Sequence, residues 1–477
     1  FEQDSTGNLV AGTGAGAAID SDTCLNILIG CNSGAALNSG DRNIVIGLNA
    51  GCAMTAALCN VMIGELAGRT LSDGTGFKNT FIGNKAGEYA TKCRNTFVGQ
   101  AAGRNTATGT QNTFIGVYAG TCMCSTEKSV AIGHGALMGS TTVSNNTAQS
   151  NIAIGLYSGH NVTSGGCNTF IGRYAGKNLT TGEHNIALGL SMHCGTVTGD
   201  HNIAIGDEAG CKLTSGNDNV FIGCEAGSTA TTSAKSIAIG KGAFSSGTGI
   251  DVVALGQYAG QNTDVHNSVY IGVNAGRCRR AYAEIAIGCY ALQGSSTTSA
   301  NYGAHNVALG SEALRCGTSG AANIAIGEYA GKRGATAFSN VFIGRRSGCG
   351  CENHSAGANA FVGQASGREI TTGRFNVMMG YYTGKDITTG YNNVFLGSYA
   401  GCTTTTGCGN IAIGRCVKLP SITGHCQLAI GYETNRWITG TSDFMVGIGT
   451  TNPSSRLSVA GDACVSGVIT ATNFAKA

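Results

Sequence analysis

Proline, tryptophan and charged side chains are all scarce in this chain of 477 residues. It contains 2 prolines and 1 tryptophan, and charged residues make up 12% of it. A collagen-like triple helix needs abundant proline and glycine at every third position, so the composition excludes it. The net charge is only +3 and there is no long basic run, which argues against a nucleic-acid partner. No apolar run approaches the roughly 18 residues of a membrane-spanning helix, so membrane insertion is not expected.

Glycine, by contrast, is abundant and recurs in a repeated motif. The motif reads Asn, an aliphatic residue, Ala or Phe, a second aliphatic residue and a marker glycine, usually followed after two free positions by Ala-Gly. Gly172 and Gly189 are successive markers, and 189 − 172 = 17 residues. A unit this short cannot bury its own apolar residues and must stack on its neighbours. The sequence therefore predicts an all-β fold, a parallel β-solenoid (β-roll) with coils of about 17 residues.

The repeat also suggests how the chain is organised. Residues 1–440 are expected to form the β-roll, with about 24–25 coils, and residues 441–477 a separate C-terminal segment. Within each coil we expect a short strand, a glycine corner, a second short strand and a return turn rich in Thr, Ser and Gly.

The repeated strand is apolar on both of its faces. Positions −1 and −3, counted from the marker glycine, are mostly aliphatic and are expected to face the inside of the coil. Position −2 is then expected to point outward, although it is nearly always Ala or Phe. A strand that is apolar on both faces is normally buried on both, and an exposed column of this kind would exceed the apolar patches of soluble monomers. The candidate interchain packing residues are Phe81, Phe114, Phe170, Phe221, Phe342 and Phe395.

The outward column predicts contact between copies of the chain around a common axis. The simplest arrangement is a homotrimer, either intertwined or side by side. The alternative is that a loop of the same chain covers the column.

Asparagine occupies position −4 in most repeats. Its side chain carries one carbonyl and one amide, so it can bond the equivalent group in the adjacent coils and also the turn backbone. We predict a structural ladder that includes Asn168, Asn185, Asn202 and Asn219.

The 21 cysteines lie mainly in or beside the predicted return turns. Cys194 and Cys211 share one register in successive coils and form a candidate disulfide, with unreacted thiols as the alternative. Neither a metal site nor a cofactor is expected, because the paired Cys-x-x-Cys or Cys/His sets typical of zinc are missing. No nucleophile with a base, phosphate-binding loop or carboxylate pair stands out, so the chain is not expected to be an enzyme.

Positive charge is concentrated in two arginine clusters. Arg277, Arg279 and Arg280 form the first, and Arg345 and Arg346 form the second. Either could contact an anionic cell-surface glycan, whereas a solvated edge is the more common role for such residues.

Several repeats resemble those of fibrous surface proteins. The segment Ser129-Val-Ala-Ile-Gly133 is similar to the head repeat of trimeric autotransporter adhesins, a family that forms trimers of left-handed parallel β-rolls. The longer Asn-Thr-Phe-Ile-Gly-x-x-Ala-Gly repeat resembles those of bacteriophage tail fibres. The stretch from Val446 to Thr472 resembles the region that, in such fibres, precedes a self-cleaving trimerisation chaperone.

These resemblances imply a structural role outside the cell. The expected function is the shaft of a phage-like tail fibre, at a virion surface, that presents or contributes to host-surface recognition. The expected partners are further copies of the chain and a host glycan or protein. A cell-surface adhesin or extracellular filament subunit is one alternative. A monomeric glycan- or ice-binding solenoid is another, although the Thr-Thr-Gly turns are too irregular for a flat Thr-x-Thr array.

Overall fold

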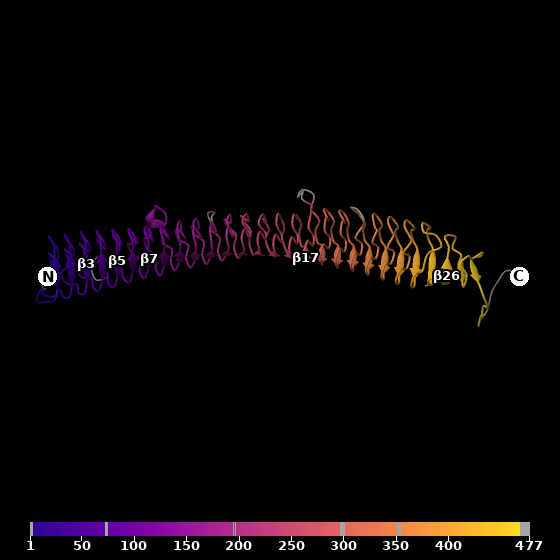
Figure 1. The fold of residues 1–477 in the computed structure, drawn as a ribbon, viewed down its shortest axis with the longest axis horizontal. Coiled ribbons are helices and arrows are strands. Elements are labelled where there is room, and N and C mark those ends of the chain that lie inside the picture. The colour runs from indigo at the N-terminus through magenta and orange to yellow at the C-terminus, as the bar shows by residue number, and fades with distance from the viewer. Residues whose placement is uncertain are drawn as a thin grey trace. The chain divides into compact units, whose positions relative to one another are not determined.

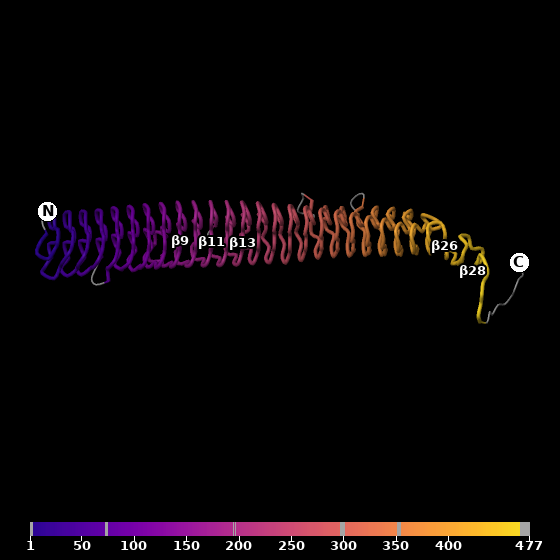
Figure 2. The backbone as a smooth tube through the Cα atoms, turned by 60° about the horizontal axis from the view of Figure 1, so that its bottom comes forward, coloured from indigo at the N-terminus to yellow at the C-terminus, as the bar shows by residue number. Residues whose placement is uncertain are grey.

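The computed structural model describes residues 3–71, 75–193, 195, 197–295, 301–350 and 354–467. Over these residues the chain is an all-β parallel β-solenoid of about 24 turns with coils of ~17 residues, as the sequence predicts. It divides into two compact units, Phe1–Asn262 and Thr263–Ala477. Within each unit, successive coils lie side by side and contribute neighbouring strands to one sheet (Figures 1 and 2).

The first unit contains one short strand per coil, and all neighbouring strands pair in parallel. The register is direct, because Thr169, Phe170 and Ile171 oppose Ile186, Ala187 and Leu188 one coil later. A 3-10 turn, η1 (Val143–Asn145), lies between β8 and β9. The strands are β1 (Leu9–Ala11), β2 (Ile27–Ile29), β3 (Ile44–Ile46), β4 (Val61–Ile63), β5 (Thr80–Ile82), β6 (Thr96–Val98), β7 (Thr113–Ile115), β8 (Val130–Ile132), β9 (Ile152–Ile154), β10 (Thr169–Ile171), β11 (Ile186–Leu188), β12 (Ile203–Ile205), β13 (Val220–Ile222), β14 (Ile237–Ile239) and β15 (Val252–Leu255).

The second unit repeats this pattern and then changes it near the C-terminus. Parallel pairing continues to β25, whereas β26 is antiparallel to both β25 and β27, and β27 and β28 are again parallel. The strands are β16 (Ser268–Ile271), β17 (Ile285–Ile287), β18 (Val307–Leu309), β19 (Ile324–Ile326), β20 (Val341–Ile343), β21 (Ala360–Val362), β22 (Val377–Met379), β23 (Val394–Leu396), β24 (Ile411–Ile413), β25 (Leu428–Tyr432), β26 (Asn435–Gly440), β27 (Val446–Ile448) and β28 (Leu457–Val459).

The second strand that we expected in each coil is replaced by a turn. After Gly172, the backbone is left-handed at both Tyr174 (φ 60) and Gly176 (φ 61), whereas a parallel strand needs φ near −120°. Coil-to-coil hydrogen bonds continue through the turn, as from Gly176 N to Met192 O at 3.0 Å. The turn therefore supplies stacking without extended structure.

The marker glycines are required by the close approach of successive coils. Gly47 has φ 138, and a Cβ at this position would lie 2.5 Å from the carbonyl oxygen of Gly64 in the next coil. Any other residue would have to push the two coils apart.

The predicted assignment of the two strand faces is wrong. Position −2 points into the coil, and the glycine at position +4 makes room for its side chain, because a Cβ on Gly176 would lie 2.4 Å from Cδ1 of Phe170. Each of these rings is fully buried within a single chain and offers no surface to another copy. The interchain role predicted for them is therefore incorrect, and this holds for Phe81, Phe114, Phe170, Phe221, Phe342 and Phe395.

The interior rings stack on one another where consecutive coils carry phenylalanine. The ring centroids of Phe81 and Phe97 are 5.0 Å apart, and those of Phe97 and Phe114 are 4.9 Å apart. These distances match the spacing of hydrogen-bonded strands, about 4.8 Å, so the sheet imposes the stack.

Candidate functional site

The outer surface of the sheet is mostly aliphatic in both units, with threonine as the first residue of β5, β6, β7 and β10. We call the side chains at positions −3 and −1 the apolar face. Ile152 of β9 and Ile171 of β10, for example, are 39% and 41% exposed. Phe170, the middle residue of β10, is fully buried. The most exposed members in the first unit are Ile63, Ile82, Ile115, Ile132, Ile152, Ile171, Ile237 and Ile239, and in the second unit Ile285, Ile287, Ile324, Ile326, Val377, Met379 and Ile411.

Charged side chains flank the apolar face but do not enter it. From β2 to β24, no residue at position −3 or −1 is charged. The positions just outside the strands do carry charge, as at Lys235 and Lys241 on either side of β14. An apolar centre with a charged rim is typical of protein interfaces. Isolated apolar residues on an ordinary protein surface do not form such a continuous pattern.

The asparagine ladder is present as predicted. The Oδ1 atom of Asn168 accepts the backbone N–H of Asn185 at 2.8 Å, and Oδ1 of Asn185 accepts that of Asn202 at 2.9 Å. Asn202 bonds Asn219 in the same way at 3.1 Å. The Asn185 amide also donates to the carbonyl of Gly199 at 2.9 Å, so each side chain ties a strand to a return turn. All four are buried, which assigns them a structural role.

Replacing Asn185 with leucine is expected to destabilise the first unit by about 3 kcal/mol, because it leaves the Asn202 N–H and the Gly199 carbonyl without partners. Asn185→Ser is the matched control, since Ser129 already holds this position and its Oγ accepts the Asn151 N–H at 3.1 Å. Denaturant unfolding followed by circular dichroism measures both variants. Equal stability of the leucine variant and the wild type would contradict the ladder's importance.

A buried polar cluster interrupts the ladder in the second unit. Glu284 takes the ladder position, and its Oε2 accepts from Nε of Arg279 at 3.1 Å and from the hydroxyl of Tyr270 at 3.2 Å. The Arg279 guanidinium also donates to the carbonyls of Gly303 and Gly317 at 2.9 and 2.7 Å. Burial and the nearby carboxylate raise the pKa of Tyr270 well above its ordinary value.

This cluster corrects the interpretation of the first arginine group. Arg279 is 1% exposed, so it cannot contact an external glycan. Its charge is compensated inside the coil by Glu284, and removing either partner would leave a buried ion unpaired.

The cysteines show no metal chemistry among the described residues. No group of at least three His, Cys, Asp or Glu side chains there is placed to hold a metal ion. The candidate disulfide between Cys194 and Cys211 falls outside the described residues, because Cys194 is not among them. Burial raises the pKa of the Cys122 and Cys402 thiols, which favours their unreactive protonated forms.

Two histidines are enclosed in the coils. Neither ring nitrogen of His193 has a hydrogen-bond partner among the described residues, and the His354 ring is buried beside the backbone of Lys332 and Gly348. Burial lowers the pKa of each ring to about 4, so both are neutral at pH 7.

Acid is expected to destabilise the protein through these histidines. An unfolded imidazole has its ordinary pKa near 6.5 and binds a proton more tightly than the folded one, so stability is complete above that pH and falls as the pH approaches 4. Each ring should account for a loss of roughly 3 kcal/mol over this window. Denaturant titrations at pH 7 and pH 4.5 measure the loss, and the double variant His193→Met/His354→Met should reduce it. An unchanged loss in that variant would contradict the assignment.

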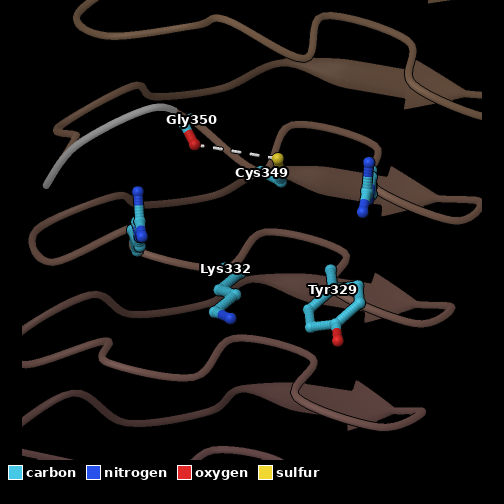
Figure 3. Close-up of a pocket in the computed structure, with 6 residues that line it drawn as sticks. Tyr329, Lys332, Cys349 and Gly350 are labelled. Atoms are coloured by element: carbon cyan, nitrogen blue, oxygen red, sulfur yellow. Dashed lines mark hydrogen bonds between the residues drawn. The ribbon is translucent and has the colours of Figure 1, made fainter.

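The second unit carries a basic pocket with a volume of about 410 Å³. Tyr329 and Lys332 come from one coil, and Cys349 and Gly350 come from the next (Figure 3). Arg333 and Arg346 complete the lining, and both are exposed. The Lys332 ammonium lies 4.5 Å from the centroid of the Tyr329 ring, and the Arg346 guanidinium carbon lies 5.7 Å from it.

Ion pairs hold part of the charge around this basic pocket. Glu312 accepts from Lys332 at 2.5 Å and from Arg315 at 2.9 Å. Burial opposes ionisation of Glu312, but the two cations outweigh it and hold the pKa below its ordinary value. Burial raises the pKa of the Cys349 thiol, so the pocket has no ready thiolate nucleophile.

The sequence indicated only one of the residues that line the basic pocket, Arg346. The other cations and Tyr329 stand at positions that looked free within the repeat. Alignment of the repeats places residues one coil apart in the same column, and this alignment would have brought Tyr329 and the other cations together.

No helix of the described residues has the length and hydropathy needed to cross a membrane. Comparison with protein-family models gives no match, and no curated protein is significantly similar to the chain.

Proposed function

We propose that the chain is a non-enzymatic fibre-shaft subunit, of the kind found in phage-like tail fibres, that assembles with its own copies and helps to present a host-recognition surface. The observation that carries the proposal is the apolar face, which extends over successive coils of each unit without a charged residue. Soluble monomers rarely expose a continuous apolar surface of this kind, so the apolar face favours association.

The apolar face favours another copy of the chain as its partner. The strands repeat in direct register at the spacing of the sheet, about 4.8 Å per coil. A second copy in the same orientation offers the same spacing and the same aliphatic side chains. The apolar face is narrow and has charged residues along its borders. Three copies of such a face can pack around one axis and leave the borders in solvent, so a homotrimer remains the proposed assembly.

The mass of the full chain in solution tests the proposal. One chain has a mass of 48.1 kDa. Light scattering after size exclusion, without cross-linking, is expected to give about three times this mass. A clean monomer would contradict assembly and favour the alternative of a monomeric solenoid that binds ice or glycan.

A further inference from the structure

We propose that the basic pocket of the second unit binds an acidic saccharide, with the tyrosine ring as a platform for a sugar ring and the surrounding cations as partners for its carboxylate or sulfate. The inference goes beyond the shaft role, since residues of the second unit form the site without a second copy of the chain.

The basic pocket arises from the alignment of two successive coils. Tyr329 and Arg346 both stand two residues after a marker glycine, with left-handed φ of 60 and 56. Strands β19 and β20 pair in direct register, so these side chains lie one coil apart. Tyr329 is half-buried and Arg346 is exposed, so both side chains are accessible at this corner.

Small residues in the second coil create the hollow. Where the first coil has Lys332 and Arg333, the second has Cys349 and Gly350 at the equivalent positions. The Cys349 sulfur turns toward the Gly350 carbonyl at 3.7 Å, as the dashed line in Figure 3 shows. Space is therefore open beside the long cationic side chains, and its 410 Å³ lies within the range of about 300–1,000 Å³ typical of small-ligand sites.

The chemistry of the lining points to a ligand with both a ring face and a negative charge. The Lys332 ammonium and the Arg346 guanidinium both lie over the Tyr329 ring, so a pyranose would lie with its C–H face against the part of the ring that these cations leave open. Arg346 presents a planar guanidinium that can bind a carboxylate through two hydrogen bonds. The Lys332 ammonium is already paired with Glu312, so Arg346 is the principal cation for the ligand. A simple inorganic anion would use the cations but not the ring.

The charge balance of the neighbouring described residues favours an anion. Glu312 offsets Lys332 or Arg315, and Glu328 pairs with Arg345 at 2.9 Å. The described cations of these two coils and of the coil before them outnumber the carboxylates. Because the excess is local and does not form a long stripe, a short acidic saccharide fits it better than a nucleic acid.

Binding measured by isothermal titration calorimetry on the full chain tests the proposal. The probes are trigalacturonic acid and a sulfated carrageenan oligosaccharide, with maltotriose and sodium sulfate as the neutral and inorganic comparisons. We expect saturable binding of at least one acidic probe that weakens in high salt, and no comparable binding of maltotriose or sulfate. Absence of saturable binding of both acidic probes, or equal binding of sodium sulfate, would overturn the proposal.

Variants locate the site. Tyr329→Asn and Arg346→Asn should each weaken binding about tenfold or more, since each removes one of the principal contacts. Asparagine suits the left-handed backbone, as Asn274 shows at the same repeat position with φ 55. The matched controls are Tyr399→Asn, at the same repeat position as Tyr329 but away from the pocket, and Arg173→Asn, which removes an arginine beside a marker glycine of the first unit. Equal losses in the controls would overturn the site.

Mass in solution separates this proposal from the shaft proposal. Tyr329 and Arg346 lie outside the apolar face, so their variants should keep the wild-type mass while binding is lost. If binding fell only together with a change of mass, the loss would belong to assembly and the site assignment would be overturned. Saturable binding by a monomeric protein would support the site even though the shaft proposal had failed.

Discussion

Replacing Phe170 with aspartate is expected to unfold the coils around β10. The ring is fully buried between the sheet and the glycine turn of its own coil, so the variant loses its packing and encloses a charge. The combined cost should exceed about 5 kcal/mol. Hydrogen exchange of residues 152–188 is expected to rise strongly, with loss of protection spreading into the neighbouring coils.

Phe170→Met is the matched control for this variant. Methionine fills the same interior position at Met62 and Met378, both fully buried, so the substitution should cost about 1 kcal/mol and leave exchange nearly unchanged. If Phe170→Asp instead produced folded chains that merely failed to associate, the interior assignment of the ring would be wrong.

The second large effect is expected on the opposite surface of the same strands. Ile154→Lys combined with Ile171→Lys places two ammonium groups in the centre of the apolar face of β9 and β10. Burying them against another copy would leave unpaired charges at the interface, so the mass in solution should fall to that of one 48.1 kDa chain. The thermal stability of each chain should change little, since both side chains are already partly exposed.

Leu190→Lys provides the control for the apolar face. Leu190 is 43% exposed but follows a marker glycine, outside the two aliphatic columns. Its variant should keep the mass of the wild type. If it dissociated the assembly as fully as the double lysine variant, the interface would lie elsewhere.

The contrast between Phe170 and Ile171 shows where sequence reasoning reached its limit. Alternation along a strand predicts that neighbours face opposite ways, and they do. It does not say which of two apolar faces is the interior. The glycine that stands four residues after most markers was the available clue, because it leaves room for a ring inside the coil, as Gly103 does for Phe97.

The surface expected to meet another copy consists of different residues from those that the sequence indicated. An apolar column that reaches solvent still requires an explanation, and it now consists of residues such as Ile152 and Ile171. The phenylalanines contribute to the stiffness of each coil and have no part in contact between chains.

The sequence by itself determined the period, the position of the one strand that each coil forms, and the asparagine ladder. These follow from local causes, because a marker such as Gly47 permits close approach and each buried asparagine must satisfy its hydrogen bonds in the next coil. Only the tertiary structure decided which face lies inside, that Arg279 is enclosed, and that Tyr329 and Arg346 meet at one pocket. Those outcomes depend on how left-handed corners close the coil and align residues from different turns, which no single repeat specifies.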